Sequence, residues 1–265
     1  MTLLALMRQP PLVLAGIAAV LTGPVLAAMP DHELFSAVLA THVKGDRVDY
    51  ASLKTDARLP AYLGQLAATD PDKLATPDEQ LAFWLNAYNA YTLKLVIDRE
   101  PEKSITELGK GGRVLGAIFK TSAWDIRFAE IGERRYTLNE IEHEIIRHKF
   151  KDARAHFALN CASGSCPILR PEAYQADQLN RQLDEQARQF LHDEARNRFD
   201  RASKTAWLSP IFSWYQKDFG HDERATLLAA AKYAPDEVRR SIEADPGAWS
   251  LKHLAYDWSL NAAKK

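Results

Sequence analysis

The stretch at residues 76–98 constrains the fold most, because a complete helix start is followed by a run that is apolar on nearly every side. Thr76, Pro77 and Glu79 supply an N-cap hydroxyl, a proline at the first helical position and a glutamate at the third. The run LAFWLNAYNAYTLKLVI behind them leaves no polar face for solvent. We therefore predict a buried central helix around which the other elements pack.

Two asparagines interrupt the apolar character of this predicted helix. Asn86 and Asn89 are one turn apart, so they face the same side. A buried amide without a hydrogen-bond partner costs about 1–3 kcal/mol. Each side chain is therefore expected to bond either the backbone of a neighbouring loop or a ligand, and both alternatives stay open.

The rest of the chain mixes helical patterns with short alternating segments, which predicts an α+β fold, mainly helical, with a small antiparallel sheet. The expected strands are residues 47–50 and a hairpin at residues 124–136. An aromatic segment at 251–261 is expected to pack back on the body. Apolar spacing predicts further helices at residues 31–43, 59–66, 137–149, 171–192, 223–233 and 235–244.

Both cysteines of the protein lie in one short segment, RAHFALNCASGSCPILR at residues 154–170. Residues 155–159 are apolar apart from His156, which predicts a buried strand that ends in a loop at Asn160. Residues 162–165 are small and polar, and Pro167 keeps the chain from resuming regular structure at once. The loop is therefore the expected place for a functional site.

The N-terminus has the organisation of a secretory signal. Residues 1–8 carry one charged side chain, residues 11–21 are apolar, and small residues follow to Ala27. The apolar run is shorter than the roughly 20 residues that a membrane span needs, so cleavage near Ala27 is expected rather than an uncleaved anchor. We predict a signal peptide at residues 1–27, a single domain at 28–265, no stable membrane span after cleavage, and a periplasmic or secreted location.

Net charge and sequence motifs limit the classes of partner that the protein is expected to bind. A formal net charge of −1 over 265 residues gives no basic surface for nucleic acid. The glycine-rich segment at residues 109–113 has its lysine in the wrong place for a phosphate-binding loop, so we predict a mobile loop there. A small molecule or a peptide is the expected partner, and no sequence feature specifies an oligomeric state.

Several motifs together resemble the domain-of-unknown-function family 547. They are FWLNAYNA at 83–90, YTLNEIEH at 136–143, HFALNCASGSCP at 156–167, FSWYQKDF at 212–219 and YDW at 256–258. The resemblance runs in order over nearly the whole chain after the predicted signal, and it implies no particular reaction. The positions that match the family's motifs are Asn86, Asn89, Glu142, His143, His156, Asn160, Cys161, Ser163, Ser165 and Cys166.

A first hypothesis makes Cys161 a nucleophile that a histidine activates as the thiolate, while an asparagine or Glu142 orients the base. A strand at residues 155–159 points His156 and Cys161 to opposite sides, which favours His143 as the base. On an α-helix, Glu142 and His143 point roughly 100° apart, so they are not expected to face one point from the helix alone. A histidine on a helix can also serve packing only.

A second hypothesis joins Cys161 and Cys166 in a disulfide that shapes the loop. A redox enzyme is disfavoured because the spacing exceeds that of C-x-x-C and no β-α-β pattern surrounds it. A metal site from His143, His156 and the two cysteines matches no common zinc spacing, so we predict no metal and no cofactor.

These hypotheses share one expected site: a pocket where the helix at 76–98, the helix at 137–149 and the cysteine loop meet. Its expected binding residues are Asn86, Asn89, Asn160, Ser163 and Ser165. The leading prediction is a thiol-dependent hydrolase or transferase that acts on peptide-like or amine-bearing small molecules. The alternative is a noncatalytic module that binds a small ligand or a partner beside the Cys161–Cys166 disulfide.

Overall fold

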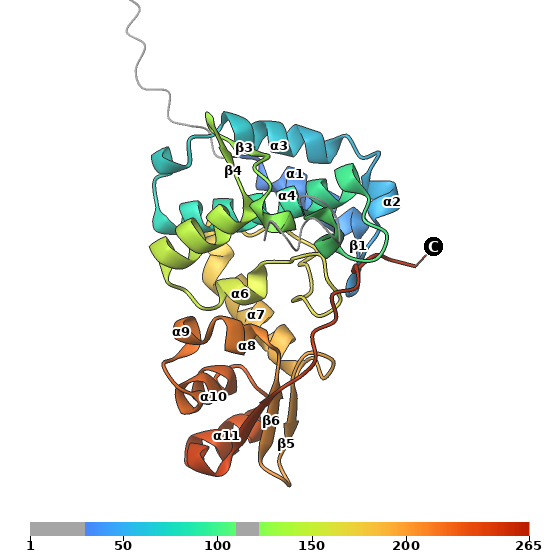
Figure 1. Ribbon diagram of the computed structural model, residues 1–265. Coiled ribbons are helices and arrows are strands. Elements are labelled where there is room, and N and C mark those ends of the chain that lie inside the picture. The colour runs from blue at the N-terminus through green and yellow to red at the C-terminus, as the bar shows by residue number, and fades with distance from the viewer. Residues whose placement is uncertain (1–29, 110–121, 265) are drawn as a thin grey trace, which may run out of the picture.

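The computed structural model describes residues 30–109 and 122–264, and the predicted central helix lies in their midst as α4, Pro77–Arg99 (Figure 1). At its start the Thr76 hydroxyl accepts a hydrogen bond from the Glu79 N–H at 3.1 Å, and the Glu79 carboxylate accepts one from the Thr76 N–H at 3.0 Å. Every side chain from Leu81 to Leu93 is buried. The predicted helix and its cap are therefore confirmed.

The elements that surround α4 come from the first two thirds of the chain (upper part of Figure 1). Two short antiparallel hairpins are present, β1 with β2 and β3 with β4. The remaining elements in this part are helices and helical turns. In chain order the elements are α1 His32–His42, β1 Val43–Lys44, β2 Arg47–Val48, α2 Tyr50–Leu53, α3 Arg58–Ala68, η1 Pro71–Lys73, η2 Ile105–Leu108, η3 Ala123–Asp125, β3 Ala129–Ile131, β4 Arg134–Tyr136, the π-helix η4 Glu140–Phe150 and α6 Ala155–Ala158.

The last third of the chain forms the lower part of Figure 1. Its three-stranded sheet has the order β5-β6-β7, in which β6 pairs antiparallel with β5 and parallel with β7. Helices pack beside this sheet. The elements are η5 Ala176–Gln178, α7 Leu179–His192, β5 Arg198–Asp200, β6 Thr205–Leu208, α8 Ile211–Trp214, α9 Gln216–Phe219, α10 Glu223–Ala231, α11 Asp236–Ala244, η6 Pro246–Ala248 and β7 Ser250–His253.

Two hydrophobic clusters form the interior, and two helices contribute to both of them. In α7, Leu183 belongs to the cluster around α4, whereas Phe190 belongs to the cluster around α8 and α10. In the short α6, Ala158 packs into the first cluster and Phe157 into the second. Burial of these apolar side chains therefore fixes the two parts against each other.

The segment after β7 leaves the lower sheet and returns to the upper part, next to β1 in Figure 1. Leu260 forms an antiparallel bridge with Ser163, and Ala262 forms a parallel bridge with Val48. The Tyr50 hydroxyl donates a hydrogen bond to the Asn261 side chain at 2.7 Å. These contacts confirm that residues 251–261 pack on the body of the protein.

The fold is mainly helical α+β, as predicted, but several details differ from the expectation. Within the hairpin expected at residues 124–136, residues 123–125 form the helical turn η3, and the paired strands are residues 129–131 and 134–136. Residues 155–159 form the short helix α6 instead of a strand, because a short apolar run has no periodicity that separates the two. The helix expected from residue 171 begins at Leu179, since residues 171–175 are held in a loop by α4. The three-stranded sheet is mixed rather than purely antiparallel.

Some predictions concern residues that the structure leaves undescribed. The signal peptide at 1–27 and residues 110–113 of the glycine-rich loop lie outside the described ranges. Among the helices within those ranges, none combines the length and the apolar character needed to cross a bilayer. The exported location stays a prediction.

A buried histidine makes the stability of the fold depend on pH. The Nδ1 atom of His32 lies 2.8 Å from the Tyr62 hydroxyl, and its Nε2 atom has no hydrogen-bond partner in the described chain. Burial lowers the pKa of His32 from 6.5 to about 4. The unfolded chain therefore takes up this proton near pH 6.5, whereas the native protein resists it until about pH 4.

We expect the free energy of unfolding to fall by up to about 3 kcal/mol through His32 as the pH is lowered from 6.5 to 4. Urea unfolding of the wild type and His32→Gln across this range measures the effect. The wild type should lose stability more steeply, because glutamine does not titrate. Parallel pH profiles for the two proteins would contradict this account.

Candidate functional site

Buried side-chain amides hold the cysteine loop to the central helix. Asn89 donates to the Ala158 carbonyl at 3.0 Å and accepts from the Asn160 N–H at 2.9 Å. Asn160 donates in turn to the Pro167 carbonyl at 2.8 Å and accepts from the Ala162 N–H at 2.9 Å. The Asn160 side chain therefore braces both ends of the loop.

Asn86 makes the same kind of contact one turn earlier. Its amide donates to the Tyr174 carbonyl and accepts from the Tyr174 N–H, both at 2.8 Å. Of the two alternatives for the asparagines of α4, the structure supports bonding to loop backbone. Neither Asn86 nor Asn89 lines the cavity described below.

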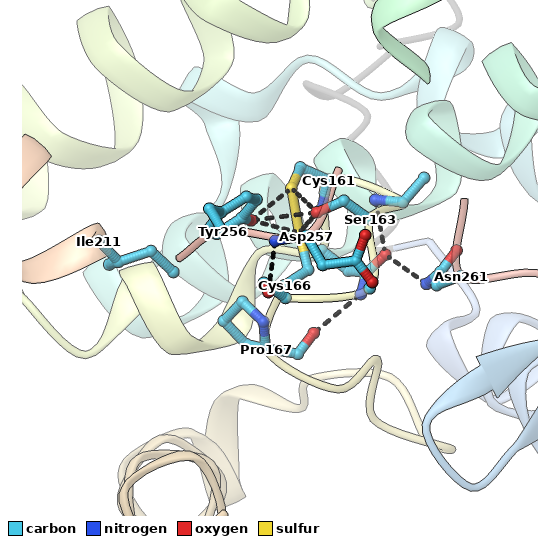
Figure 2. The surroundings of a disulfide bond; sticks show 12 residues. Cys161, Ser163, Cys166, Pro167, Ile211, Tyr256, Asp257 and Asn261 are labelled. Carbon is cyan, nitrogen blue, oxygen red and sulfur yellow. Dashed lines mark hydrogen bonds between the residues drawn. A yellow bond between two sulfur atoms is a disulfide. The ribbon is translucent and has the colours of Figure 1, made fainter. Parts of the chain in front are cut away.

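Cys161 and Cys166 form a disulfide, as the second hypothesis predicted, and their Cα atoms are 6.1 Å apart (Figure 2). The described chain holds no free cysteine. Cys161 is half-buried, whereas only 2% of the surface of Cys166 is exposed. In this state neither sulfur is a nucleophile, so the thiol chemistry of the first hypothesis requires reduction.

The C-terminal segment covers the loop and brings a tyrosine to the disulfide (Figure 2). The Tyr256 hydroxyl lies 3.3 Å from the Cys161 sulfur and 3.1 Å from the Ser163 hydroxyl. Burial raises the pKa of Tyr256 to about 12, so its phenol stays protonated at neutral pH. Ser163 lies within the same loop, where its hydroxyl forms hydrogen bonds with the Tyr256 hydroxyl and with both sulfur atoms.

The same segment pairs with the loop backbone. The Gly164 N–H donates to the Ser259 carbonyl at 2.8 Å, and the Ser165 hydroxyl accepts from the Asp257 N–H at 2.8 Å. A Cβ atom on Gly164 would lie 2.5 Å from a carboxylate oxygen of Asp257, so a larger residue here would displace the Asp257 side chain.

A cavity of about 190 Å³ lies where α4, η4 and the cysteine loop meet, as predicted. Side chains of α8 and of the C-terminal segment complete its wall, so both halves of the chain contribute to it. Its lining residues are Tyr88, Trp124, Asn139, Glu142, His143, His156, Leu159, Cys161, Cys166, Pro167, Ile211, Trp214, Tyr215, Tyr256 and Trp258.

Glu142 and His143 both face this cavity, contrary to the expectation from α-helical geometry. The helix begins with the predicted capping box, in which Thr137 and Glu140 exchange hydrogen bonds of 2.8 and 3.0 Å. It continues as the π-helix η4, whose i→i+5 hydrogen bonds give a wider turn. The wider turn brings consecutive side chains somewhat closer in direction, and both Glu142 and His143 line the cavity.

The candidate base His156 contacts a carboxylate that the sequence did not single out. Its Nε2 atom donates to Asp218 at 2.6 Å, and its ring stacks on Tyr215 with centroids 4.1 Å apart. The guanidinium of Arg147 donates to the same Asp218 oxygen at 2.6 Å. The hydrogen bond from His156 and the contact with Arg147 hold the pKa of Asp218 well below its ordinary value.

Arg147 also contacts the second candidate base. Its NH1 group lies 3.1 Å from Nδ1 of His143. Because a guanidinium can only donate, this ring nitrogen is the acceptor of the hydrogen bond. A carboxylate oxygen of Glu142 lies 3.9 Å from the same nitrogen.

Sequence analysis missed several residues that build the site. Tyr215 and Asp218 lie in the motif FSWYQKDF, which was recognised as a motif without a role for either residue. Arg196 is buried and donates to the Cys166 carbonyl at 2.6 Å and to the Gly164 carbonyl at 2.9 Å. No pattern around Arg196 indicated this contact. In the described ranges no group of three or more His, Cys, Asp or Glu residues is placed to hold a metal.

Replacing Asn86 tests whether the amide bridges stabilise the fold. Asn86→Ala leaves the buried N–H and carbonyl of Tyr174 without partners, so we expect the free energy of unfolding to fall by about 2–4 kcal/mol. Lys94→Ala on the same helix removes only a surface ion pair with Asp98 and should cost less than about 1 kcal/mol. Chemical denaturation of both variants measures the two free energies of unfolding. Equal losses of stability would contradict the stabilising role of the Asn86 hydrogen bonds.

The comparisons with known proteins concern the middle of the chain. Residues 71–191 match the family model described as "Protein of unknown function, DUF547". The match spans α4, η4 and the cysteine loop and ends before Asp218 and Tyr256. No curated protein and no solved structure matches the chain.

Proposed function

Because residues 71–191 place this chain in the DUF547 family, whose description names no activity, we propose a function from the cavity itself. The protein binds a small organic molecule between the disulfide loop and the aromatic side chains of α8 and the C-terminal segment. One observation carries the proposal: helices from both parts of the fold, the disulfide and the last segment converge on one cavity of about 190 Å³.

The construction of the cavity wall supports binding. Pockets for small ligands are usually preformed and mainly apolar, with a few polar groups. Here the disulfide and the Asn160 bridges fix the loop, so little conformational entropy is lost when a ligand enters. The aromatic side chains of Trp214 and Trp258 are 49% and 38% exposed and supply contact surface that solvent can reach.

We also propose that the protein works outside the cytoplasm. The predicted signal at residues 1–27 motivates this location. The Cys161–Cys166 disulfide is compatible with it, since oxidised pairs persist mainly in exported proteins.

Retention of small molecules by the purified protein tests the binding proposal. The protein is incubated with a small-molecule extract, recovered by gel filtration, and analysed by mass spectrometry of the released compounds. Wild type should retain at least one compound about tenfold more than Trp214→Ala/Trp258→Ala, because both indoles line the cavity. Trp207→Ala, which removes an exposed tryptophan outside the cavity, is the matched control. Equal retention by all three proteins would refute the proposal.

A second function, thiol-dependent hydrolysis or acyl transfer, is favoured by the contact between His156 and Asp218. Asp218 fixes Nε2 of His156 as the donor, which leaves Nδ1 as the basic nitrogen. A dithiol reductant would first cleave the disulfide, giving two thiols and an oxidised reductant. Cys161 would then transfer its proton to a histidine and attack a carbonyl, and the leaving group would depart with that proton. Water, or an acceptor nucleophile in acyl transfer, would cleave the acyl–sulfur bond and restore the thiol.

Alkylation of the reduced protein tests this second function. As purified, the protein should show no reactive thiol; after reduction, the half-buried Cys161 should react before Cys166. His156→Gln should slow alkylation of Cys161 near pH 6 about tenfold if the imidazole promotes the thiolate. His148→Gln, an exposed histidine outside the cavity, serves as the control. Identical rates in all proteins would exclude the thiol mechanism.

A further inference from the structure

The arrangement around Glu142 indicates what kind of molecule the cavity accepts. We infer that it binds the positively charged end of an amine or a quaternary ammonium compound, with Glu142 as the counter-ion. The inference rests on the proposed function because it concerns the same cavity, and it adds the charge of the ligand.

Among the described residues, no lysine or arginine forms an ion pair with the Glu142 carboxylate. Its residue surface is only 8% exposed, and it lines the cavity. An unpaired buried charge is costly, so buried carboxylates are normally paired or hydrogen-bonded. The Tyr88 and Tyr215 hydroxyls hydrogen-bond Glu142, and the only basic nitrogen that the described residues place within 4 Å of its carboxylate is Nδ1 of His143, at 3.9 Å.

Neither His143 nor Arg147 forms an ion pair with Glu142 at hydrogen-bonding distance. The Nδ1 atom of His143 accepts a hydrogen bond from Arg147 at 3.1 Å. The guanidinium itself is paired with Asp218 at 2.6 Å. Arg147 is therefore already paired with another carboxylate, although its charge also acts on Glu142, and the side of Glu142 that lines the cavity is open to a ligand.

The phenols beside Glu142 also supply no positive charge. Burial and the negative charge of Glu142 raise the pKa values of Tyr88 and Tyr215. Both side chains therefore stay protonated and neutral. Their hydroxyls satisfy part of the hydrogen-bonding capacity of the carboxylate but bring no positive charge to it.

Aromatic rings form much of the remaining wall. The centroids of Trp214 and Tyr256 are 4.8 Å apart, and those of Tyr256 and Trp258 are 4.5 Å apart; Trp124 contacts Trp258 edge-on at 6.0 Å. Aromatic rings attract ammonium groups, and clusters of them recognise quaternary ammonium ligands. A carboxylate beside such rings favours a cation over a neutral molecule and repels an anion.

The size of the cavity limits the ligand to a small group. A volume of 190 Å³ corresponds to about six water molecules, below the range of pockets that enclose drug-sized compounds. An ammonium head with a short chain matches this volume. A larger ligand would place its charged end here and leave its remainder near the exposed indoles of Trp214 and Trp258.

Two probes of nearly equal shape separate charge from size: choline, and its neutral isostere 3,3-dimethylbutan-1-ol. Isothermal titration calorimetry and tryptophan fluorescence of the full protein measure their dissociation constants. We expect choline to bind about tenfold or more tightly than the alcohol. Glu142→Gln should abolish this preference, whereas Glu144→Gln, which changes an exposed carboxylate on the same helix, should preserve it.

The outcomes distinguish this inference from the proposed function. Equal binding of choline and the alcohol to wild type would overturn the cation inference and leave small-molecule binding intact. Failure of both probes would also overturn the inference, and retention of a compound from the extract would still support the proposed function. Because the probe comparison uses the wild type, the test does not depend on the folding of Glu142→Gln.

Discussion

The site depends on a continuous chain of buried amide hydrogen bonds. Asn89 on α4 bonds the backbone of Asn160, and the Asn160 side chain accepts from the Asn261 amide at 3.3 Å. An amide left unpaired in this interior would cost about 1–3 kcal/mol, so each asparagine fixes the position of the next. These hydrogen bonds fix the relative positions of the central helix, the cysteine loop and the C-terminal segment. The cavity lies where the three segments meet.

A second constraint is the helical geometry of η4. Consecutive side chains diverge by roughly 100° on a regular α-helix, and the wider turn of a π-helix lowers this angle. Glu142 and His143 lie on the π-helical backbone and both line the cavity, and π-helical turns are frequent at functional sites. The π-helix η4 thus carries two of the ionisable residues that line the cavity.

Local patterns predicted the parts of the fold that are specified locally. The cap of α4, the burial of its asparagines and the capping box at Thr137 follow from residues a few positions apart. The contact between His156 and Asp218 joins positions 62 residues apart, and no local pattern encodes it. The strand expected at residues 155–159 was wrong for a different reason: a run of five residues with four apolar side chains is compatible with either secondary structure.

The return of the C-terminal segment has a consequence for biosynthesis. Tyr256, Asp257 and Asn261 contact a loop that lies some 90 to 100 positions earlier in the chain. A nascent polypeptide that ends before Tyr256 therefore lacks the hydroxyl that contacts the disulfide and two of the aromatic side chains that line the cavity. Both cysteines are synthesised before this segment, so the pair is available for oxidation before the segment reaches it.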